Sequence, residues 1–563
     1  MSESNQHSET AWERAVTRRM FLQTTAAAGS SLSLAGLLAA CGGDEAAPTG
    51  AEESTTAADT IVVAHFSDMQ NLDPHTSSAD TATQEVLTNI YDVWLTYQVP
   101  GFEEEGVDWA NVSEFMPWAA ESWEYNGDGT ELTFTLRDDL KFPDGSPITA
   151  DAVKFTTDRM FDIQAVASFL FAIVGITKKE QLEVVDDRRF KLVLPAPVGD
   201  PLLLGNMAMF FSTGIVNPAV VEEHATESDP TASEWLKTNT ADSGPYVLKE
   251  WNVGQGWTLE ANPNHWNPPK TKRIVFRIVP DAQQRELLIR SGEVDMTYGI
   301  PVKDVEALKE DPNLNVISVP TRKVAWAGFD VTAPPFDQKI VRQALSYAVP
   351  YETIMQEVLR GEGVQLKSPI PEGTPTSDFS FWQYDTNPDR ARELLAEAGF
   401  ADGFQTELAV PIGNPIDEET AVWIQQGLQE VGVRVSINKM PSAAFTTALQ
   451  GQKHKFWFSS DAWISINNDP FYHLFWLFAA DCCTYGKYQN PRVVELVNKW
   501  MTAPAEDPGR VEASKEAQRI IVDDAPWIFL YQPPQIYVLR KEIQGFTHYS
   551  SDNYVRYSPL TKT

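Results

Sequence analysis

The stretch that decides the fold covers residues 136–155 and reads LRDDLKFPDGSPITADAVKF. It follows on from residues 132–137, where apolar and polar side chains alternate as they do in a half-buried β-strand. The Asp-Gly pair at 144–145 is typical of a tight turn. Thr149 is then a candidate N-cap for a helix, and Asp151 would lie in its first turn, where negative charge is favourable. The stretch therefore predicts a strand, a turn and a helix, and its residues have scaffold roles.

Strand and helix signals alternate along the rest of the chain, which favours a mixed α/β fold. Residues 122–125 alternate like residues 132–137, and the segment between them contains NGDG at 126–129, so the sequence predicts a hairpin. A helix that starts with Asn-Pro and stops at Gly is predicted over residues 387–399. A second predicted helix leads into an alternating strand at residues 433–438.

Length and charge limit the possible classes of protein. The chain has 563 residues and a formal net charge of −34. Residues 1–40 carry equal numbers of Arg and Glu, so the acidic excess belongs to the remainder. A body of about 500 residues is too large for one hydrophobic core, so at least two lobes are expected. The acidic surface repels phosphate backbones, which excludes nucleic acid as a partner.

The N-terminal segment has the features of an export signal. Two arginines at 18–19 precede a run of apolar and small residues at 24–40, which is too short and too rich in Ala, Gly and Ser for a good membrane-spanning helix. Leu-Ala-Ala stands directly before Cys41, which resembles the lipobox of bacterial lipoproteins. We therefore expect a twin-arginine lipoprotein signal with a lipidated cysteine at 1–41 and a flexible tether at 42–60. An uncleaved N-terminal membrane anchor is the alternative.

Several segments resemble, in order, the peptide/nickel class of ABC-importer substrate-binding proteins, solute-binding family 5. The most specific of these segments is residues 136–155, where members of the family have a strand, a Lys-Phe-x-Asp-Gly turn and a helix that starts with Thr-Ala-x-Asp-Val. Pro143 replaces the histidine that is usual in this turn. The other matching elements are SGPY at 243–246, GEVD at 292–295, PFD at 335–337, VRQAL at 341–345, AGF at 398–400 and NP at 490–491. The resemblance runs from about residue 61 to the C-terminus.

The resemblance implies an enlarged class II periplasmic-binding-protein fold, in which a two-strand hinge joins two α/β lobes and the ligand lies in the cleft between them. Lobe I is expected at 61–279 and 530–563, and lobe II at 280–529. The expected crossing strands are residues 272–279 and 527–531. Ligand would close the lobes for recognition by a permease. No Gly-x-x-x-x-Gly-Lys-Ser/Thr loop occurs in the sequence, so the permease and ATPase are expected to be separate partner subunits of a monomeric binding protein.

One stretch bears on the identity of the ligand. Peptide-binding relatives carry a Trp, then three residues later an Asp that pairs with the ligand's ammonium group, and then an acidic residue and Pro. Trp463 and the pair at 469–470 match, whereas Ile466 stands at the carboxylate position. A buried ammonium without a carboxylate keeps its desolvation penalty, so the peptide assignment is weakened. Asp461 could take the amine from another direction.

Aromatic side chains are the other candidate ligand contacts, because flat faces suit sugar rings and other amphipathic solutes. Taken singly, each of these aromatic residues is more simply explained as a core residue, except that the motif of Trp463 lines the pocket in relatives. The predicted ligand-binding residues are Trp463, Asp461, Asn468, Trp326, Phe329, Tyr91 and Trp94.

Metal binding and catalysis are not predicted. The 8 histidines are scattered singly, without His-x-His or Cys-x-x-Cys spacing, so neither a metal nor a cofactor is expected. One of them, His473, interrupts the apolar run at 471–480, which is too short to span a membrane and predicts a buried helix. No Gly-x-Ser-x-Gly elbow is present and no carboxylate pair stands out, so no catalytic residue is assigned. The adjacent Cys482 and Cys483 could form a vicinal disulfide or remain free thiols.

Together these features predict the extracytoplasmic substrate-binding subunit of an ABC importer, held by lipid on the outer face of the cell membrane. An oligosaccharide or another ligand that is not a standard peptide is favoured, and an oligopeptide is the alternative within the family. A cell-surface glycoside-processing enzyme and a signalling receptor domain are the alternatives from other classes.

Overall fold

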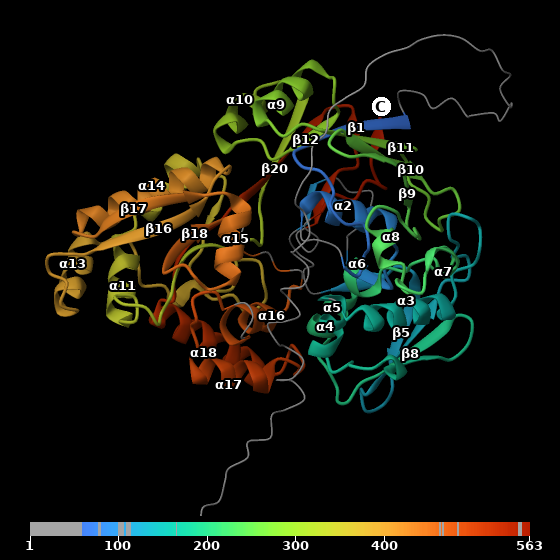
Figure 1. The fold of residues 1–563 in the computed structure, drawn as a ribbon, viewed down its shortest axis with the longest axis horizontal. Coiled ribbons are helices and arrows are strands. Elements are labelled where there is room, and N and C mark those ends of the chain that lie inside the picture. Colours follow the sequence, from blue (N-terminus) through green and yellow to red (C-terminus); the bar gives the residue numbers. More distant parts are fainter. Residues whose placement is uncertain are drawn as a thin grey trace, which may run out of the picture. The chain divides into compact units, whose positions relative to one another are not determined.

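Two β-sheets organise the chain in the computed structural model (Figure 1). The structure describes residues 59–76, 80–98, 106–108, 114–164, 166–460, 463, 465, 467–480, 484–549 and 554–563. These described residues belong to one unit, Ala58–Thr563. The mixed α/β architecture expected from the alternating strand and helix signals is confirmed.

The larger sheet has seven strands in the order β13-β20-β12-β1-β11-β10-β9. Its strands are β1 (Thr60–His65), β9 (Tyr246–Asn252), β10 (Gly256–Ala261), β11 (Arg273–Ile278), β12 (Met296–Tyr298), β13 (Leu314–Pro320) and β20 (Pro534–Arg540). β1 lies between β11 and β12 and is parallel to both. Its apolar sequence TIVVAH is mostly buried, as expected for a central parallel strand that is covered on both faces.

The stretch at residues 136–155 folds as predicted, with one difference at the helix cap. The expected hairpin consists of β5 (Ala120–Tyr125) and β6 (Glu131–Leu136), which join β7 (Leu182–Val184) and β8 (Arg189–Val193) in a four-stranded sheet. In the turn that follows, Gly145 has a φ of +86°, which favours glycine. Thr149 occupies the N-cap position of α3 (Ala150–Ile163), but its side chain makes no capping hydrogen bond.

The second main sheet has six strands in the order β15-β19-β14-β18-β16-β17. Its strands are β14 (Ala325–Phe329), β15 (Val364–Gln365), β16 (Gln405–Pro411), β17 (Arg434–Met440), β18 (Phe456–Ser459) and β19 (Trp527–Gln532). The predicted helix beginning after Asn387 is α13 (Pro388–Glu397), and the Asn387 side chain accepts from the Arg390 N–H. The second predicted helix is α14 (Pro415–Glu430), which leads into β17 as expected.

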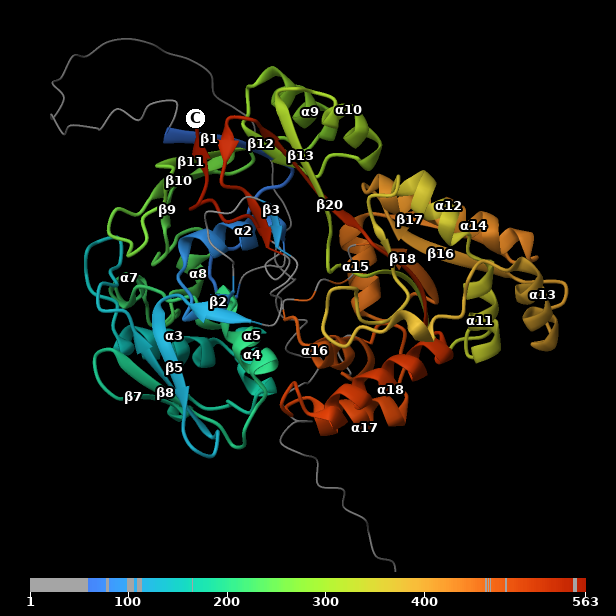
Figure 2. The ribbon, with the colours of Figure 1, turned by 180° about the vertical axis from the view of Figure 1, so that it is seen from behind.

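The chain passes between the two main sheets at two places that differ from the expected ones. β13 belongs to the seven-stranded sheet and β14 to the six-stranded sheet, so the first passage is at residues 321–324. The return lies at Pro533, between β19 and β20 (Figure 2). The expected crossing at 272–279 is wrong, because β11 is an interior strand paired with β1 and β10. The expected crossing at 527–531 is β19 itself, which stays in the six-stranded sheet.

The remaining helices and short strand pairs surround these sheets. The helices are α2 (Thr81–Ile90), α4 (Val166–Ile173), α5 (Asp200–Met207), α6 (Phe210–Thr213), α7 (Pro218–His224), α8 (Ser233–Leu236), α9 (Ala282–Ser291), α10 (Val305–Lys309), α11 (Lys339–Ala348), α12 (Tyr351–Thr353), α15 (Ser442–Gln450), α16 (Pro470–Leu474), α17 (Pro491–Trp500) and α18 (Pro508–Asp524). The short pairs are β2 (Leu95–Tyr97) with β4 (Phe115–Pro117), β3 (Gly106–Asp108) with β22 (Thr547–Tyr549), and β21 (Ile543–Gln544) with β23 (Thr561–Lys562).

Apolar packing connects the seven-stranded sheet with α16, α17 and α18. One core cluster includes Leu203 of α5, Phe471 of α16 and Val497 of α17. A wide turn of helix at Phe475–Ala479 continues α16, so the predicted buried helix at 471–480 is confirmed. In the described part of the chain, no helix combines the length and the apolar character needed to cross a membrane.

Candidate functional site

The segment between β18 and α16 is held firmly at both ends. At its start, the backbone N–H of Ser460 donates to Oδ1 of Asp417 at 3.1 Å, and the Ser460 hydroxyl donates to the same oxygen. At its end, Asp469 caps α16 by accepting from the N–H of Phe471 at 2.8 Å. The Asp469 carboxylate also accepts from the guanidinium of Arg510 on α18 at 2.7 and 2.5 Å, and both side chains are buried. The fixed ends position Trp463 and Asn468, which are described residues between them.

The same segment contacts α5, on the side of the seven-stranded sheet. The Asn467 Nδ2 donates to the Leu202 carbonyl at 3.1 Å and to the Asn206 Oδ1 at 2.8 Å. Gly205 makes this approach possible, because a Cβ there would lie 2.7 Å from the Asn467 Nδ2 and 2.9 Å from the Tyr97 hydroxyl. Figures 1 and 2 both show α4 and α5 beside α16. The segment that follows β18 of the six-stranded sheet therefore meets a helix that shares a core cluster with strand β1 of the seven-stranded sheet.

Buried polar atoms without a hydrogen-bond partner gather in and beside this segment. Both amide atoms of Asn468, both ring nitrogens of His473 and the indole nitrogens of Trp463 and Trp476 find no partner in the described part of the protein. His473 is 0% exposed and Asn468 is 2% exposed. Burial, with a smaller contribution from the charge of Arg322, lowers the pKa of His473 to about 3, so its ring is neutral. Folded proteins rarely leave buried polar groups unpaired, so these atoms mark a place where a ligand can supply the partners.

Other aromatic rings lie beside Trp463 and Trp476. The Trp463 ring centroid lies 6.3 Å from that of Trp476 and 6.5 Å from that of Tyr472, and the last two are 6.0 Å apart. Phe169 of α4 packs against Trp476 with centroids 4.9 Å apart. Trp463 is half-buried, so part of its ring remains available for contact. We call Trp463, Asn468, His473 and Trp476 the polar-aromatic cluster.

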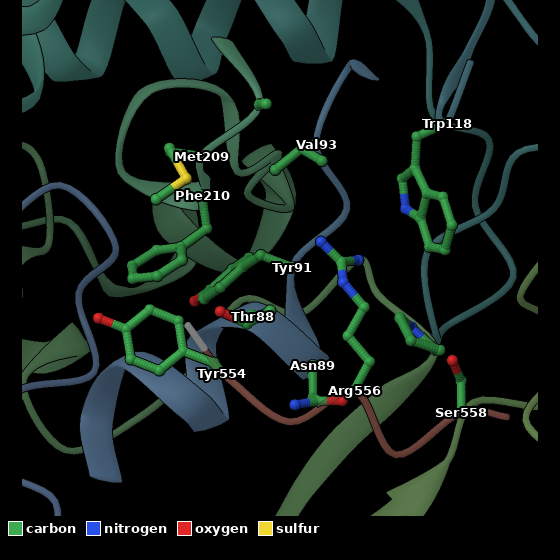
Figure 3. A pocket seen from close by; sticks show the side chains of 12 residues that line it. Thr88, Asn89, Tyr91, Val93, Trp118, Met209, Phe210, Tyr554, Arg556 and Ser558 are labelled. Atoms are coloured by element: carbon green, nitrogen blue, oxygen red, sulfur yellow. The ribbon is translucent and has the colours of Figure 1, made fainter. Parts of the chain in front are cut away.

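A separate pocket lies at the end of α2 (Figure 3). Its lining residues are Thr88, Asn89, Tyr91, Val93, Trp118, Ala208, Met209, Phe210, Pro245, Tyr554, Arg556 and Ser558. The Arg556 side chain extends past Asn89 and Tyr91 towards Val93 in Figure 3, and its guanidinium donates to the Thr96 Oγ1 at 3.0 Å. The Tyr91 hydroxyl accepts from the Ala241 N–H at 3.1 Å. These contacts tie the polar groups of the pocket to the surrounding backbone and to β2.

The structure brings together only some of the residues predicted to bind ligand. Trp463 and Asn468 belong to the polar-aromatic cluster, whereas Tyr91 lines the separate pocket. The other three described candidates are fully buried among aromatic rings: Trp326 stacks on Trp527 at 4.1 Å, Phe329 stacks on Phe456 at 5.0 Å, and Trp94 meets Phe190 edge-on at 4.7 Å. Asp461, Ile466, Cys41, Cys482 and Cys483 lie outside the described residues.

Sequence reasoning missed His473, Trp476 and the contact of Asn467 with α5. In the sequence, His473 is a polar interruption in an apolar run. That interruption was the usable signal, because a buried histidine needs partners for its ring nitrogens. The contact between Asn467 and α5 had no signal, because it joins residues more than two hundred positions apart. No group of three or more His, Cys, Asp or Glu side chains suited to a metal ion occurs among the residues that the structure describes.

Comparison with solved structures defines the class of fold. The chain superimposes on an ABC transporter-associated periplasmic binding protein from Helicobacter pylori, solved in complex with the peptide STSA, with a TM-score of 0.75. The two share 22% sequence identity, and the match covers 89% of this chain and 98% of that chain. The fold is therefore the two-lobed α/β fold of periplasmic binding proteins.

Comparison of sequences defines the family. Residues 114–481 match the family model described as bacterial extracellular solute-binding proteins, family 5 Middle. The chain is 29% identical to the probable D,D-dipeptide-binding periplasmic protein of Escherichia coli strain K12, over 87% of this chain and 91% of that protein. It is 28% identical to the glutathione-binding protein of Pectobacterium atrosepticum, over 87% of this chain and 92% of that protein. The chain belongs to the family 5 solute-binding proteins, whose members bind solutes and are not enzymes.

Proposed function

We propose that this protein is the substrate-binding subunit of an ABC importer and that it captures a small solute at the polar-aromatic cluster. The observation that carries the proposal is the set of buried polar atoms on Asn468, His473, Trp463 and Trp476 that find no partner in the part of the chain that the structure describes. In a member of a solute-binding family, a concentration of such atoms in one stretch beside a half-buried tryptophan is best explained as a set of ligand contacts. The names of the relatives, which specify a D,D-dipeptide and glutathione, support a peptide or a similar solute.

Within that class we propose a ligand that is not a standard peptide, such as a modified peptide or an oligosaccharide. Ile466 stands where the motif of peptide-binding relatives has a carboxylate. The rings of Trp463, Tyr472 and Trp476 offer apolar faces suited to such solutes. An ordinary oligopeptide remains the alternative that the relatives favour.

We further propose that ligand binding closes the two lobes around the cluster. The lobes expected from the sequence are residues 61–279 with 530–563 for lobe I and residues 280–529 for lobe II. We propose that the hinge itself lies at residues 321–324 and Pro533, because there the backbone passes from one main sheet to the other. In the closed arrangement Asn467 hydrogen-bonds α5. A ligand that contacts both lobes favours this arrangement by its greater affinity for it.

The cellular setting is also a proposal. We place the protein outside the cytoplasm on the outer face of the cell membrane, where a lipidated Cys41 would hold it after twin-arginine export. It would act as a monomer and deliver its solute to separate permease and ATPase subunits. The word periplasmic in the name of the Escherichia coli relative supports the extracytoplasmic placement.

Mass spectrometry of the native protein tests this function. A solute that co-purifies should appear as a non-covalent mass increment, should be released on denaturation, and should raise the melting temperature when added back in excess. The recovered solute should be chemically unchanged after long incubation with the protein, which separates a binding protein from a glycoside-processing enzyme. Failure to retain any small solute from cell extracts or defined libraries would contradict the proposal.

A further inference from the structure

The polar-aromatic cluster offers mainly hydrogen-bond donors. An indole nitrogen can only donate, so Trp463 and Trp476 each present one N–H that has no partner among the described residues. Asn468 presents an amide NH₂ group and a carbonyl oxygen, and both are buried and find no partner in the same described ranges. His473 is neutral and therefore presents one N–H and one acceptor nitrogen. Donors outnumber acceptors on this surface.

The two described carboxylates that hold the ends of the segment between β18 and α16 are already engaged. Asp469 accepts from Arg510 and from the N-terminus of α16. Asp417 accepts from the backbone and hydroxyl of Ser460. An ammonium group brings only donors and would need such carboxylates to offset its loss of hydration. Oxygen atoms of amides, hydroxyls or carboxylates would instead complement the free N–H groups.

We infer that the cluster binds solutes through oxygen acceptors, and that the end of the ligand lying there carries no free ammonium group. The class of ligand is thus N-acylated peptides or oxygen-rich neutral and acidic solutes, in preference to peptides with a free amino terminus. This inference rests on the proposed function, because it describes the ligand of the same site. It assigns His473 and Trp476 as specificity-determining residues through their N–H groups.

A competition between matched solutes tests the inference. The full chain is incubated with equal amounts of a tripeptide pool, the same pool after N-acetylation, and a mixture of malto- and cello-oligosaccharides. Retained solutes are then quantified by mass spectrometry. We expect the solutes without an amine to exceed the free-amine peptides at least tenfold. Equal retention, a preference for the free-amine pool, or retention of none of the three mixtures would overturn the inference.

Two indole variants show whether the N–H group is responsible. Trp476→Phe keeps an aromatic ring and removes the donor, so retention of the preferred solute should fall about threefold to tenfold. Trp257→Phe is the matched control, because the Trp257 indole nitrogen is also buried and without a partner among the residues described, but it lies on β10. Unchanged retention of the preferred solute by Trp476→Phe would contradict the assignment. Preference for free-amine peptides would refute the inference and leave the proposed function standing, whereas retention of no solute of any kind would refute both.

Discussion

At the scale of single residues, exposure separates the site from the core more clearly than unpartnered atoms do, because the indole nitrogens of both Trp326 and Trp463 lack a partner among the described residues. Trp326 and Trp463 show the difference between a core residue and a candidate ligand contact. Trp326 is 0% exposed and stacks on Trp527, whereas Trp463 is half-buried and its ring centroid lies 6.3 Å from that of Trp476 and 6.5 Å from that of Tyr472. From the sequence, both tryptophans are candidate ligand contacts, because residue type alone does not reveal burial. The motif of Trp463 was the only sequence feature that separated them.

The two tryptophans should respond differently to truncation. Trp463→Ala should weaken binding of the recovered solute tenfold or more, because it removes an aromatic face and an N–H donor, with little change in melting temperature. Trp326→Ala should instead lower the free energy of unfolding by about 3–5 kcal/mol, since it leaves a cavity in the core. Calorimetry and chemical denaturation of both variants measure these quantities. Unchanged affinity in Trp463→Ala would remove that residue from the site.

At the scale of secondary-structure elements, local sequence signals predicted more than long-range ones. The hairpin of β5 and β6, the start of α13 at Asn387, and the strand β17 were all recognisable, because turn residues, caps and alternation act within a few positions. The passage between sheets was misplaced, because the apolar pattern of β11 does not specify which strands lie beside it. The contact of Asn467 with α5 could not be predicted either, because it joins residues that are far apart in the sequence.

Gly205 should control how closely α5 can approach the segment before α16. In Gly205→Ala the added Cβ would collide with the Asn467 Nδ2 and the Tyr97 hydroxyl, so the closed arrangement is disfavoured. We expect a larger radius of gyration by small-angle scattering and at least tenfold weaker solute binding. Gly127→Ala is the matched control, because a Cβ there meets nothing within 4 Å. Wild-type scattering and affinity in Gly205→Ala would show that this contact does not govern closure.

At the scale of the whole molecule, a buried carboxyl connects α2, the seven-stranded sheet and the C-terminal segment. Glu85 of α2 accepts from the hydroxyl of Tyr298 on β12 at 2.8 Å and from that of Tyr557 at 2.6 Å. Burial raises the pKa of Glu85 to about 7, although these hydrogen bonds oppose the shift. The native protein therefore holds a proton on Glu85 at pH values where the unfolded chain has released it.

This difference predicts how stability depends on pH. Between about pH 4.5 and 7 the native state binds the proton and the unfolded state does not, so the contribution of Glu85 to the free energy of unfolding falls as pH rises, by roughly 3 kcal/mol across the window. Glu85→Gln keeps an acceptor for the two hydroxyls and cannot ionise, so its denaturation curves should lose this decline. Burial also raises the pKa of Asp242 to about 7, so the contribution of Asp242 to the free energy of unfolding should still decline with pH in the Glu85→Gln variant. An identical pH dependence in wild type and Glu85→Gln would contradict the prediction.

Membrane attachment is a second property of the whole molecule. Cys41→Ala should leave the protein uncleaved or released from the membrane, because the proposed acceptor of the lipid is lost. Arg18→Lys combined with Arg19→Lys should trap the protein in the cytoplasm, if the arginine pair directs export. Cell fractionation and immunoblotting measure both outcomes. A mature Cys41→Ala protein that remained in the membrane fraction would contradict lipid anchoring at that residue.

The most direct test of the central claim is a crystal structure of the protein with its co-purified solute. The account predicts continuous ligand density beside Trp463 and Trp476, with ligand oxygen atoms within hydrogen-bond distance of Asn468 and His473. Density for the solute in the pocket at the end of α2, or a polar-aromatic cluster whose unpartnered atoms bind only water, would contradict it.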